Sequence, residues 1–166
     1  VVSYRGTDEN PLDIATGWIS GAGLLGTPYN QSQLAVNFYK AVAGSTDPYL
    51  ANISTTGHSL GGGLAGLVAA LYRQPADIFD NMPFELAVTT LAPLLLISGS
   101  PAANFSGISA YATTGEALEA IRTLQGTPVT RLDSHGGTRS PVALHSQSLL
   151  VNLMYAKQND FTDWHV

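Results

Sequence analysis

The sequence predicts an α/β fold with a mostly parallel sheet covered by helices on both faces. The main observation is that short apolar, β-branched segments alternate with longer segments whose apolar residues recur at helical spacing. The chain has 166 residues, which is typical of one domain, and 45% hydrophobic residues, which is enough to form a core. We therefore expect a single domain over residues 1–166.

The first half of the chain supplies two strands and two helices. Residues 1–4 are apolar and β-branched and run into a polar turn, which is typical of a strand. Residues 31–42 carry apolar side chains at helical spacing, and the buried face is expected to comprise Leu34, Phe38, Ala41 and Val42, widened by Ala35 and Tyr39. A short strand candidate, 52–56, precedes an apolar, alanine-rich helix, 60–72.

The second half continues the alternation. Residues 73–83 are polar and predict a loop, whereas residues 86–91 are rich in leucine and β-branched residues and predict a buried strand. The remaining expected elements are an extension or further strand at 94–98, a strand at 108–113, a helix at 117–124, a strand at 128–132, a loop at 133–144, and a helix at 146–155 with Leu149, Leu150, Leu153 and Met154 at core spacing.

Composition excludes several classes of function. The net charge is −5 and the seven basic residues are scattered, so we expect no nucleic-acid partner. The absence of cysteine excludes disulfides, thiolate metal sites and a cysteine nucleophile. The longest apolar run, 86–98, is too short for a transmembrane helix. The chain starts within a strand and without Met, which indicates a processed protein or a piece of a longer one.

One motif carries chemistry. Gly57-His58-Ser59-Leu60-Gly61 matches G-x-S-x-G and lies between a predicted strand and a predicted helix. In a nucleophile elbow, this sharp turn lifts the serine Oγ above the sheet, and the two glycines relieve steric crowding. The alternative is a glycine-rich helix entrance in which Ser59 is only the N-cap. The strand–turn–helix setting favours Ser59 as a nucleophile.

A serine nucleophile needs a histidine base, and the chain has four histidines. His58 adjoins the serine and is expected to have a packing role, and His165 is next to the C-terminus. His135 and His145 both lie between the last predicted strand and the last predicted helix. We favour His145 because it adjoins the amphipathic helix, and His135 remains the alternative.

The base needs an orienting acid, which in an α/β-hydrolase lies between the serine and the histidine. Six carboxylates qualify: Asp77, Asp80, Glu85, Glu116, Glu119 and Asp133. Functional groups gather at the carboxyl ends of parallel strands. Three of the six are predicted to lie at the opposite end, namely Asp77, Asp80 and Glu85, while Glu119 lies inside a helix. We favour Glu116 over its rival Asp133, although Glu116 could also merely complement a helix dipole.

Two backbone amides are expected to stabilise the oxyanion of an attacked carbonyl. The amide of Leu60 follows the serine at the N-terminus of a helix. The second donor is expected in Arg5-Gly6-Thr7, after the first strand, where hydrolases supply their other N–H group. We assign it to the backbone of Thr7.

These motifs resemble the class 3 lipases, the fungal-type triacylglycerol lipases and their bacterial relatives. Tyr4-Arg5-Gly6-Thr7-Asp8 is similar to the family's strand and R-G-T signature, and the stretch Gly57-His58-Ser59-Leu60-Gly61-Gly62-Gly63-Leu64-Ala65 is similar to its serine elbow. Leu144-His145-Ser146 is similar to its histidine segment. The resemblance covers roughly residues 1–157. It implies an α/β-hydrolase fold, no cofactor, ester hydrolysis, Ser59 as nucleophile, His145 as base, and the Thr7 and Leu60 amides as oxyanion donors.

The chain also departs from that family. Glu116 stands where an aspartate is usual, and the upstream strands and helix of larger members are missing, which predicts a reduced version of the fold. Residues 11–30 and 73–84 are the two stretches that could cover the site. We expect a lipase or esterase that acts on lipid or acyl esters, touches a lipid interface transiently, binds no metal, and is secreted or extracytoplasmic. The alternatives are a phospholipase A1, a thioesterase, an acyltransferase or a non-catalytic binding module.

Overall fold

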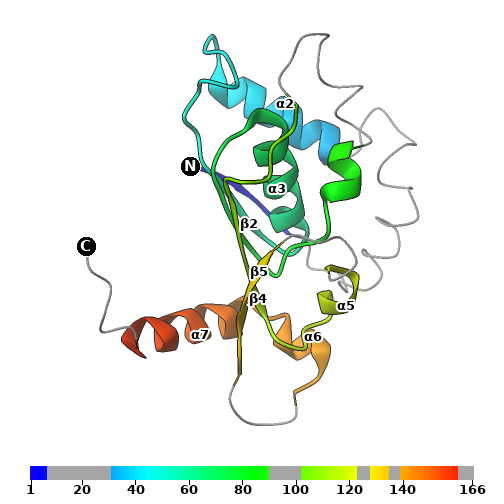
Figure 1. The fold of residues 1–166 in the computed structure, drawn as a ribbon, viewed down its shortest axis with the longest axis vertical. Coiled ribbons are helices and arrows are strands. Elements are labelled where there is room, and N and C mark those ends of the chain that lie inside the picture. The colour runs from blue at the N-terminus through cyan, green and yellow to red at the C-terminus, as the bar shows by residue number, and fades with distance from the viewer. Residues whose placement is uncertain (7–30, 90–101, 123–127, 135–138, 161–166) are drawn as a thin grey trace.

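The computed structural model describes residues 1–6, 31–89, 102–122, 128–134 and 139–160 (Figure 1). These residues contain a five-stranded sheet in which all strands are parallel and the order in space is the order in the chain. The strands are β1 (Val2–Tyr4), β2 (Thr55–His58), β3 (Ala76–Phe79), β4 (Ile108–Thr113) and β5 (Val129–Leu132). The helices are α2 (Gln31–Ala43), α3 (Leu60–Tyr72), α5 (Glu119–Arg122), α6 (Pro141–Leu144) and α7 (Gln147–Asp160). The predicted α/β class is confirmed.

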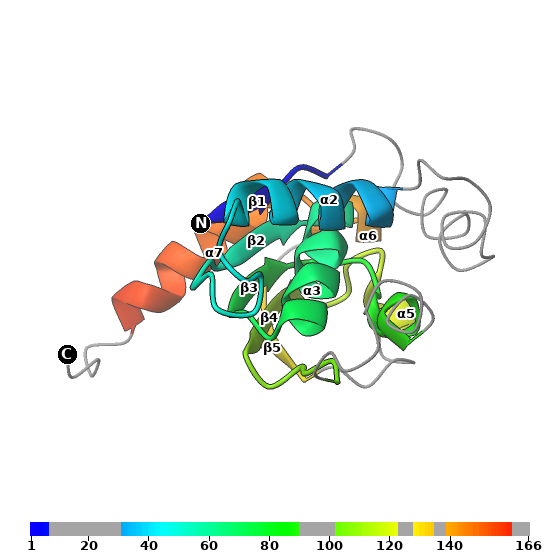
Figure 2. The same ribbon diagram turned by 90° about the horizontal axis from the view of Figure 1, so that it is seen from above.

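Helices lie on both faces of the sheet, as expected. Helices α3 and α2 cover one face and α7 lies over the other (Figure 2). Side chains alternate accordingly along β2. Thr55 faces α3 and its Oγ1 donates a hydrogen bond to the carbonyl of Ala65 at 3.0 Å, whereas Thr56 and His58 line a cavity beneath α7. Ser59, which follows β2, therefore lies at the carboxyl end of the sheet, between the helical layers on its two faces.

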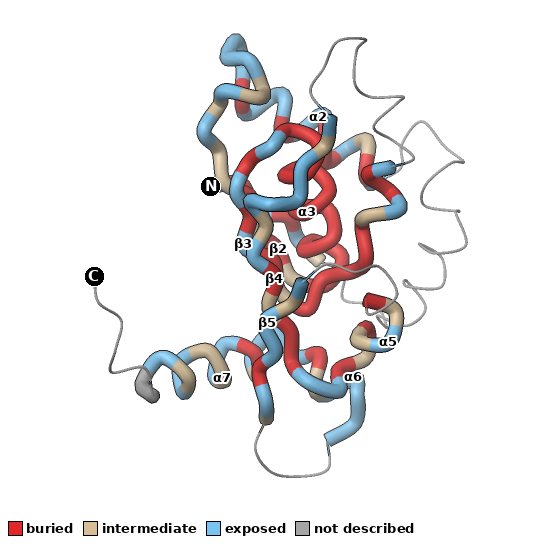
Figure 3. Tube along the Cα trace, in the orientation of Figure 1, coloured by how far each residue is buried: buried red, intermediate tan, exposed pale blue. Residues whose placement is uncertain are grey.

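Helix α3 forms the centre of the core. All thirteen of its residues are buried, and it appears as the continuous red coil of Figure 3. A helix that is apolar on every side needs cover on every side. The sheet and α2 provide part of this cover, and residues 82–84 provide more. A Cβ on Gly66 would lie 2.6 Å from the ring of Phe84, so glycine lets this segment pack directly on the helix.

The predicted buried face of α2 is correct only in part. The helix begins and ends almost as expected, but Leu34 and Phe38 are each 51% exposed. The structure buries Ala35 and Tyr39, which were expected to widen the face, together with Ser32, Val36 and Ala43. These residues include small ones that allow close packing on α3, and Tyr39 stacks on Tyr72 with ring centroids 4.9 Å apart. Burial in α2 therefore follows the shape of the neighbouring helix rather than the largest apolar side chains.

Two further predictions between α3 and β4 are wrong. Residues 76–79, expected in a polar loop, form β3 in the middle of the sheet, with Ala76 and Ile78 buried and Asp77 exposed. The strand expected at 86–91 is helical over residues 86–89, and its last two residues lie outside the described residues. The stretch 73–84 is consequently part of the sheet and core and is no candidate for a cover over the site. Residues 11–30, the other candidate, lie outside the described residues.

The later elements agree with expectation in type and differ at their boundaries. Strand β2 extends to His58, and the predicted loop 133–144 contains the short helix α6. Of the four residues expected at core positions of α7, only Leu150 is fully buried, because α7 covers the sheet at one end. The strand expected at 94–98 lies outside the described residues. None of the helices in the described part of the chain is long and apolar enough to cross a membrane.

Candidate active site

Ser59 occupies a strained turn between β2 and α3. Its backbone φ is 57° and ψ is −125°, an unfavourable conformation for a residue other than glycine. Backbone hydrogen bonds hold it there: its N–H donates to the Phe79 carbonyl at 3.0 Å, and its own carbonyl accepts from the amides of Gly63 and Met82. The side chain of Ser59 makes no cap hydrogen bond to α3. It is thus held in the turn without the capping contact that would explain a merely structural serine.

Glycines permit this turn by removing atoms that would collide with backbone. A Cβ on Gly61 would lie 2.1 Å from the carbonyl oxygen of Tyr4, and one on Gly57 would lie 2.3 Å from the backbone of Gly61. Real Cβ atoms do not approach so closely, and backbone atoms cannot move aside as a flexible side chain can. The start of α3 therefore packs directly against the end of β1.

The ring of His145 lies next to the side chain of Ser59. It is the C-cap of α6, whose N-terminus is capped by Ser140, so the histidine backbone is tied to a regular turn. The ring Nε2 lies 2.9 Å from Ser59 Oγ, within hydrogen-bonding distance, and the residue is 7% exposed. The alternative base, His135, and the terminal His165 both lie outside the described residues.

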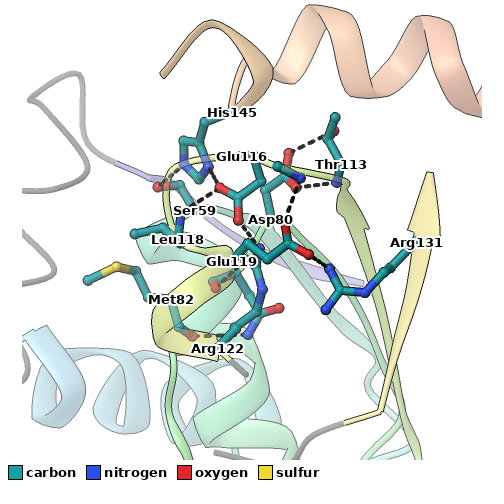
Figure 4. A network of polar contacts seen from close by, with 12 residues as sticks. Ser59, Asp80, Met82, Thr113, Glu116, Leu118, Glu119, Arg122, Arg131 and His145 are labelled. Carbon is teal, nitrogen blue, oxygen red and sulfur yellow. Dashed lines mark hydrogen bonds and ion pairs between the residues drawn. The ribbon is translucent and has the colours of Figure 1, made fainter. Parts of the chain in front are cut away.

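Glu116 lies on the other side of the histidine ring. It follows β4 after Gly115, whose φ of +79° turns the chain at the end of the strand. Its Oε2 is 2.5 Å from His145 Nδ1 and also accepts the amide of Leu118 at 2.9 Å. Ser59, His145 and Glu116 therefore form one continuous line of contacts (Figure 4). The rival acid, Asp133, is exposed.

Arg122 holds the second oxygen of the Glu116 carboxylate. Its Nη2 forms an ion pair with Oε1, and its Nη1 donates a hydrogen bond to the carbonyl of Asn81 at 2.7 Å. Both partners of the ion pair are buried. Arg122 was not among the predicted site residues, although an arginine six residues after a candidate acid, in a chain with only 11% charged residues, is a signal that points to it.

Glu85 is a second carboxylate near Arg122. Burial raises the pKa of Glu85 above its ordinary value of 4.5, while two backbone hydrogen bonds and the positive charge of Arg122 act in the opposite direction. Desolvation is the largest of these effects. Arg122 thus forms its ion pair with Glu116 and acts on Glu85 only through its charge, among the contacts of the described residues.

Asp80 lies close to the site, contrary to its predicted position at the opposite end of the sheet. It directly follows β3, so it stands at the carboxyl end of that strand, and it is fully buried. Its Oδ1 accepts the amide of Thr113 at 2.8 Å, and its Oδ2 lies 3.7 Å from His58 Nε2. The prediction failed because it missed β3 and counted strand ends without it.

His58, Asp80 and His145 are also the group of possible metal ligands that the described residues contain, with one ligating atom from each within 4.8 Å of the others. However, the two ring nitrogens of His145 already face Ser59 and Glu116. A metal ion would have to take one of these contacts, because neutral imidazole offers a single lone pair. The arrangement therefore fits proton transfer better than metal binding.

Of the two expected oxyanion donors, the structure describes only the amide of Leu60. Leu60 is the first residue of α3, where backbone N–H groups have no acceptor within the helix and the helix dipole is positive. This amide can receive a developing negative charge. Gly6, which precedes the other expected donor, packs against the end of β2, since a Cβ there would lie 2.8 Å from the His58 carbonyl oxygen. Thr7 itself lies outside the described residues.

Comparison with known proteins supports a lipase-like family. The family model of the Tle-like phospholipase domain, described as phospholipase-like, matches residues 1–158. Over 57 residues the chain is 44% identical to "Putative lipase ATG15" of Debaryomyces hansenii. This matched segment covers 34% of this chain and 9% of that protein. The chain thus spans only a small part of that relative. These findings support a lipase-like family in general rather than class 3 lipases in particular, and the chain belongs to the Tle-like phospholipase domain family.

Proposed function

We propose that this chain is a serine carboxylic-ester hydrolase that removes acyl groups from lipids. Ser59 is the nucleophile, His145 the general base and Glu116 the acid that orients it. The observation that carries the proposal is the buried line from Ser59 Oγ to His145 Nε2, at 2.9 Å, and from His145 Nδ1 to Glu116 Oε2, at 2.5 Å. A nucleophile, a base and an orienting acid in hydrogen-bond contact are what acyl transfer through a covalent intermediate requires.

The reaction proceeds in two halves. Ser59 Oγ attacks the ester carbonyl carbon while His145 Nε2 takes its proton, and the amides of Leu60 and Thr7 stabilise the resulting oxyanion. The carbon–oxygen bond to the alcohol then breaks, and His145 returns the proton to the leaving oxygen, which leaves an acyl group on Ser59. Water then attacks this acyl-enzyme while His145 takes its proton, the bond between the acyl carbon and Ser59 Oγ breaks, and His145 returns the proton to Oγ as the carboxylic acid leaves.

The family match favours a phospholipid as the acyl donor over the triacylglycerol that the motif resemblance suggests. Both substrates carry the same carboxylic ester, and the proposed machinery acts on that ester. Head-group preference is therefore a separate property from the chemistry of Ser59, and the test below measures the two independently.

The decisive experiment compares wild type, Ser59→Ala and the control Ser109→Ala, which alters an exposed serine of β4. Each protein is given phosphatidylcholine vesicles, a triacylglycerol emulsion and a p-nitrophenyl acyl ester. We expect free fatty acid and lysophospholipid from wild type and Ser109→Ala, and at least about a 10³-fold lower rate from Ser59→Ala. Release of the phosphorylated head group, or full activity of Ser59→Ala with its fold intact, would refute the proposal.

Labelling with a fluorophosphonate probe separates an enzyme from a binding module with the same fold. The proposal expects wild type to be labelled on Ser59 and Ser59→Ala to remain unlabelled, because the probe needs an activated serine. Failure of the folded wild-type chain to react with the probe and with every ester, thioester and amide offered would instead favour a non-catalytic module.

A further inference from the structure

We propose that Arg122 is a positioning residue for this reaction: its guanidinium fixes Glu116 in the one orientation that holds His145 against Ser59. The inference rests on the proposed function and adds a fourth residue to its machinery. The first support is burial. Arg122 is 6% exposed and Glu116 is 3% exposed, so neither charge is solvated by bulk water. A buried arginine is retained only where its charge and donors are matched.

The second support is that the two oxygens of the Glu116 carboxylate have different partners. Arg122 occupies Oε1 of Glu116, while His145 Nδ1 and the amide of Leu118 occupy Oε2. Each oxygen therefore has its own partners, so rotation of the carboxylate about its last bond would break both sets. Without the arginine, only the Oε2 contacts would remain, and Oε1 would be a buried charged atom without its cation.

The third support is where the guanidinium is anchored. Nη1 of Arg122 donates to the carbonyl of Asn81 at 2.7 Å, and Asn81 lies in the turn after β3. Glu116 lies in the turn after β4. The planar guanidinium thus connects two neighbouring strand ends, and its rigid fork passes the position of one turn to the carboxylate in the other. A lysine has no such fork and cannot hold both points with the same geometry.

A second arginine–glutamate pair in the same region shows what is special about Arg122. Arg131 of β5 and Glu119 of α5 also form an ion pair, but their side chains are 43% and 26% exposed. Exposed ion pairs contribute little to folding stability, because water competes for both partners and the side chains lose conformational entropy. Arg131 thus provides a control with the same residue types: its ion pair lies outside the contacts of the Glu116 carboxylate described above, and Glu119 is joined to Glu116 through the backbone, where its N–H donates to the Glu116 carbonyl at 3.1 Å.

The experiment measures kcat and KM for Arg122→Met, Arg122→Lys and the control Arg131→Met, with thermal unfolding of each protein. We expect Arg122→Met to lower kcat about 100-fold with KM changed less than about twofold, since misplacing a catalytic group by about 1 Å has that effect on chemistry. Arg122→Lys should recover about tenfold of that loss by restoring the charge without the fork. Arg131→Met should stay within about twofold of wild type.

A double-mutant cycle with Glu116→Gln distinguishes positioning from a general structural role. If Arg122 acts through Glu116, adding Arg122→Met to Glu116→Gln costs no further rate, and the double variant is about as fast as Glu116→Gln alone. If Arg122 only supports the fold, the two losses multiply. The double variant also removes both buried charges together, so it keeps the test informative if Arg122→Met alone unfolds.

The outcomes separate this inference from the proposed function. Loss of activity in Ser59→Ala together with a wild-type kcat in Arg122→Met, or with multiplying losses in the cycle, would overturn the role of Arg122 and leave the serine hydrolase intact. Full activity in Ser59→Ala would overturn the proposed function whatever Arg122→Met does. Non-additive losses with both single variants folded would support both.

Discussion

The two halves of the proposed site are built by different means. The serine half, residues 57–63, depends on atoms that are missing: glycines allow backbone segments to touch at distances no side chain would permit. The acid half, around Glu116 and Arg122, depends on buried charges and on donors that satisfy them. The serine half is therefore sensitive to added volume, and the acid half is sensitive to lost charge or reach.

Gly61→Ala should disrupt the serine half through volume alone. The added Cβ would lie 2.1 Å from the Tyr4 carbonyl oxygen and 2.7 Å from the Arg5 backbone, so β1 and α3 must separate. We expect at least about 3 kcal/mol less free energy of unfolding, measured with urea, together with loss of esterase activity. Gly107→Ala is the control, because its Cβ would meet atoms at an ordinary 3.4 Å. A stable Gly61→Ala protein would show that the close approach is not required.

Glu116→Asp should damage the acid half while the charge stays constant. The side chain is one methylene shorter, so its carboxylate cannot contact both His145 and Arg122 from the present backbone position. We expect kcat to fall about 10²-fold, as for a misplaced catalytic group, with KM nearly unchanged. Asp133→Asn is the comparison. If that change lowers kcat by orders of magnitude and Glu116→Asp does not, Asp133 is the acid.

Asp80 contacts His58 of the serine half and Thr113 at the end of β4, next to the acid half. Its variants show whether its negative charge or its hydrogen bond to Thr113 stabilises the fold. Asp80→Ala leaves the buried Thr113 amide without its acceptor and should cost about 2–3 kcal/mol of unfolding free energy, whereas Asp80→Asn keeps an acceptor oxygen and should cost about 1 kcal/mol. The control is Asp77→Asn on the exposed side of β3, which should be neutral. Equal losses in the two Asp80 variants would mean that the charge, rather than the acceptor, stabilises this position.

Glu85→Gln should have the smallest effect, and it should depend on pH. Because burial raises the pKa of Glu85, the folded protein holds this proton more tightly than the unfolded chain. The stabilisation is complete below the ordinary pKa of 4.5 and is lost as pH rises through the higher pKa of the folded state. Glu85→Gln should therefore unfold at a higher temperature than wild type near pH 7 and at nearly the same temperature near pH 4. A constant difference across this range would contradict the sign.

The contrast between the halves also explains what the sequence could predict. The serine half is contiguous, so its strand, turn and helix can be recognised within a few residues, and helix 60–72 was predicted with its observed boundaries. The acid half is assembled from turns far apart in the chain, with Asn81 and Arg122 separated by 41 positions. Arg122 lies only six residues after Glu116, which is a local signal, but no local pattern indicates that the guanidinium also contacts Asn81 in the turn after β3.

The errors in the fold have a common physical cause. Strand β3 was missed because one of its four residues, Asp77, is charged and faces outward, so the segment resembles a polar loop. Residues 86–89 were expected in a strand because they are rich in leucine and β-branched residues, yet they are helical in the segment that follows the cover over α3. In both places tertiary packing overrides local composition. The missed strand then carried its error into the site, because Asp80 was assigned to the wrong end of the sheet.

The order of the strands has a consequence for how the molecule is made. Because β1 to β5 adjoin one another in chain order, each strand can dock on an edge that already exists as the polypeptide emerges during synthesis, without waiting for a later strand to be inserted between two earlier ones. The proposed nucleophile, acid and base follow one another along the chain in that order, and His145 comes only after β5. A nascent chain would thus synthesise all five described strands before it could cleave an ester, so these strands can assemble before the proposed activity appears.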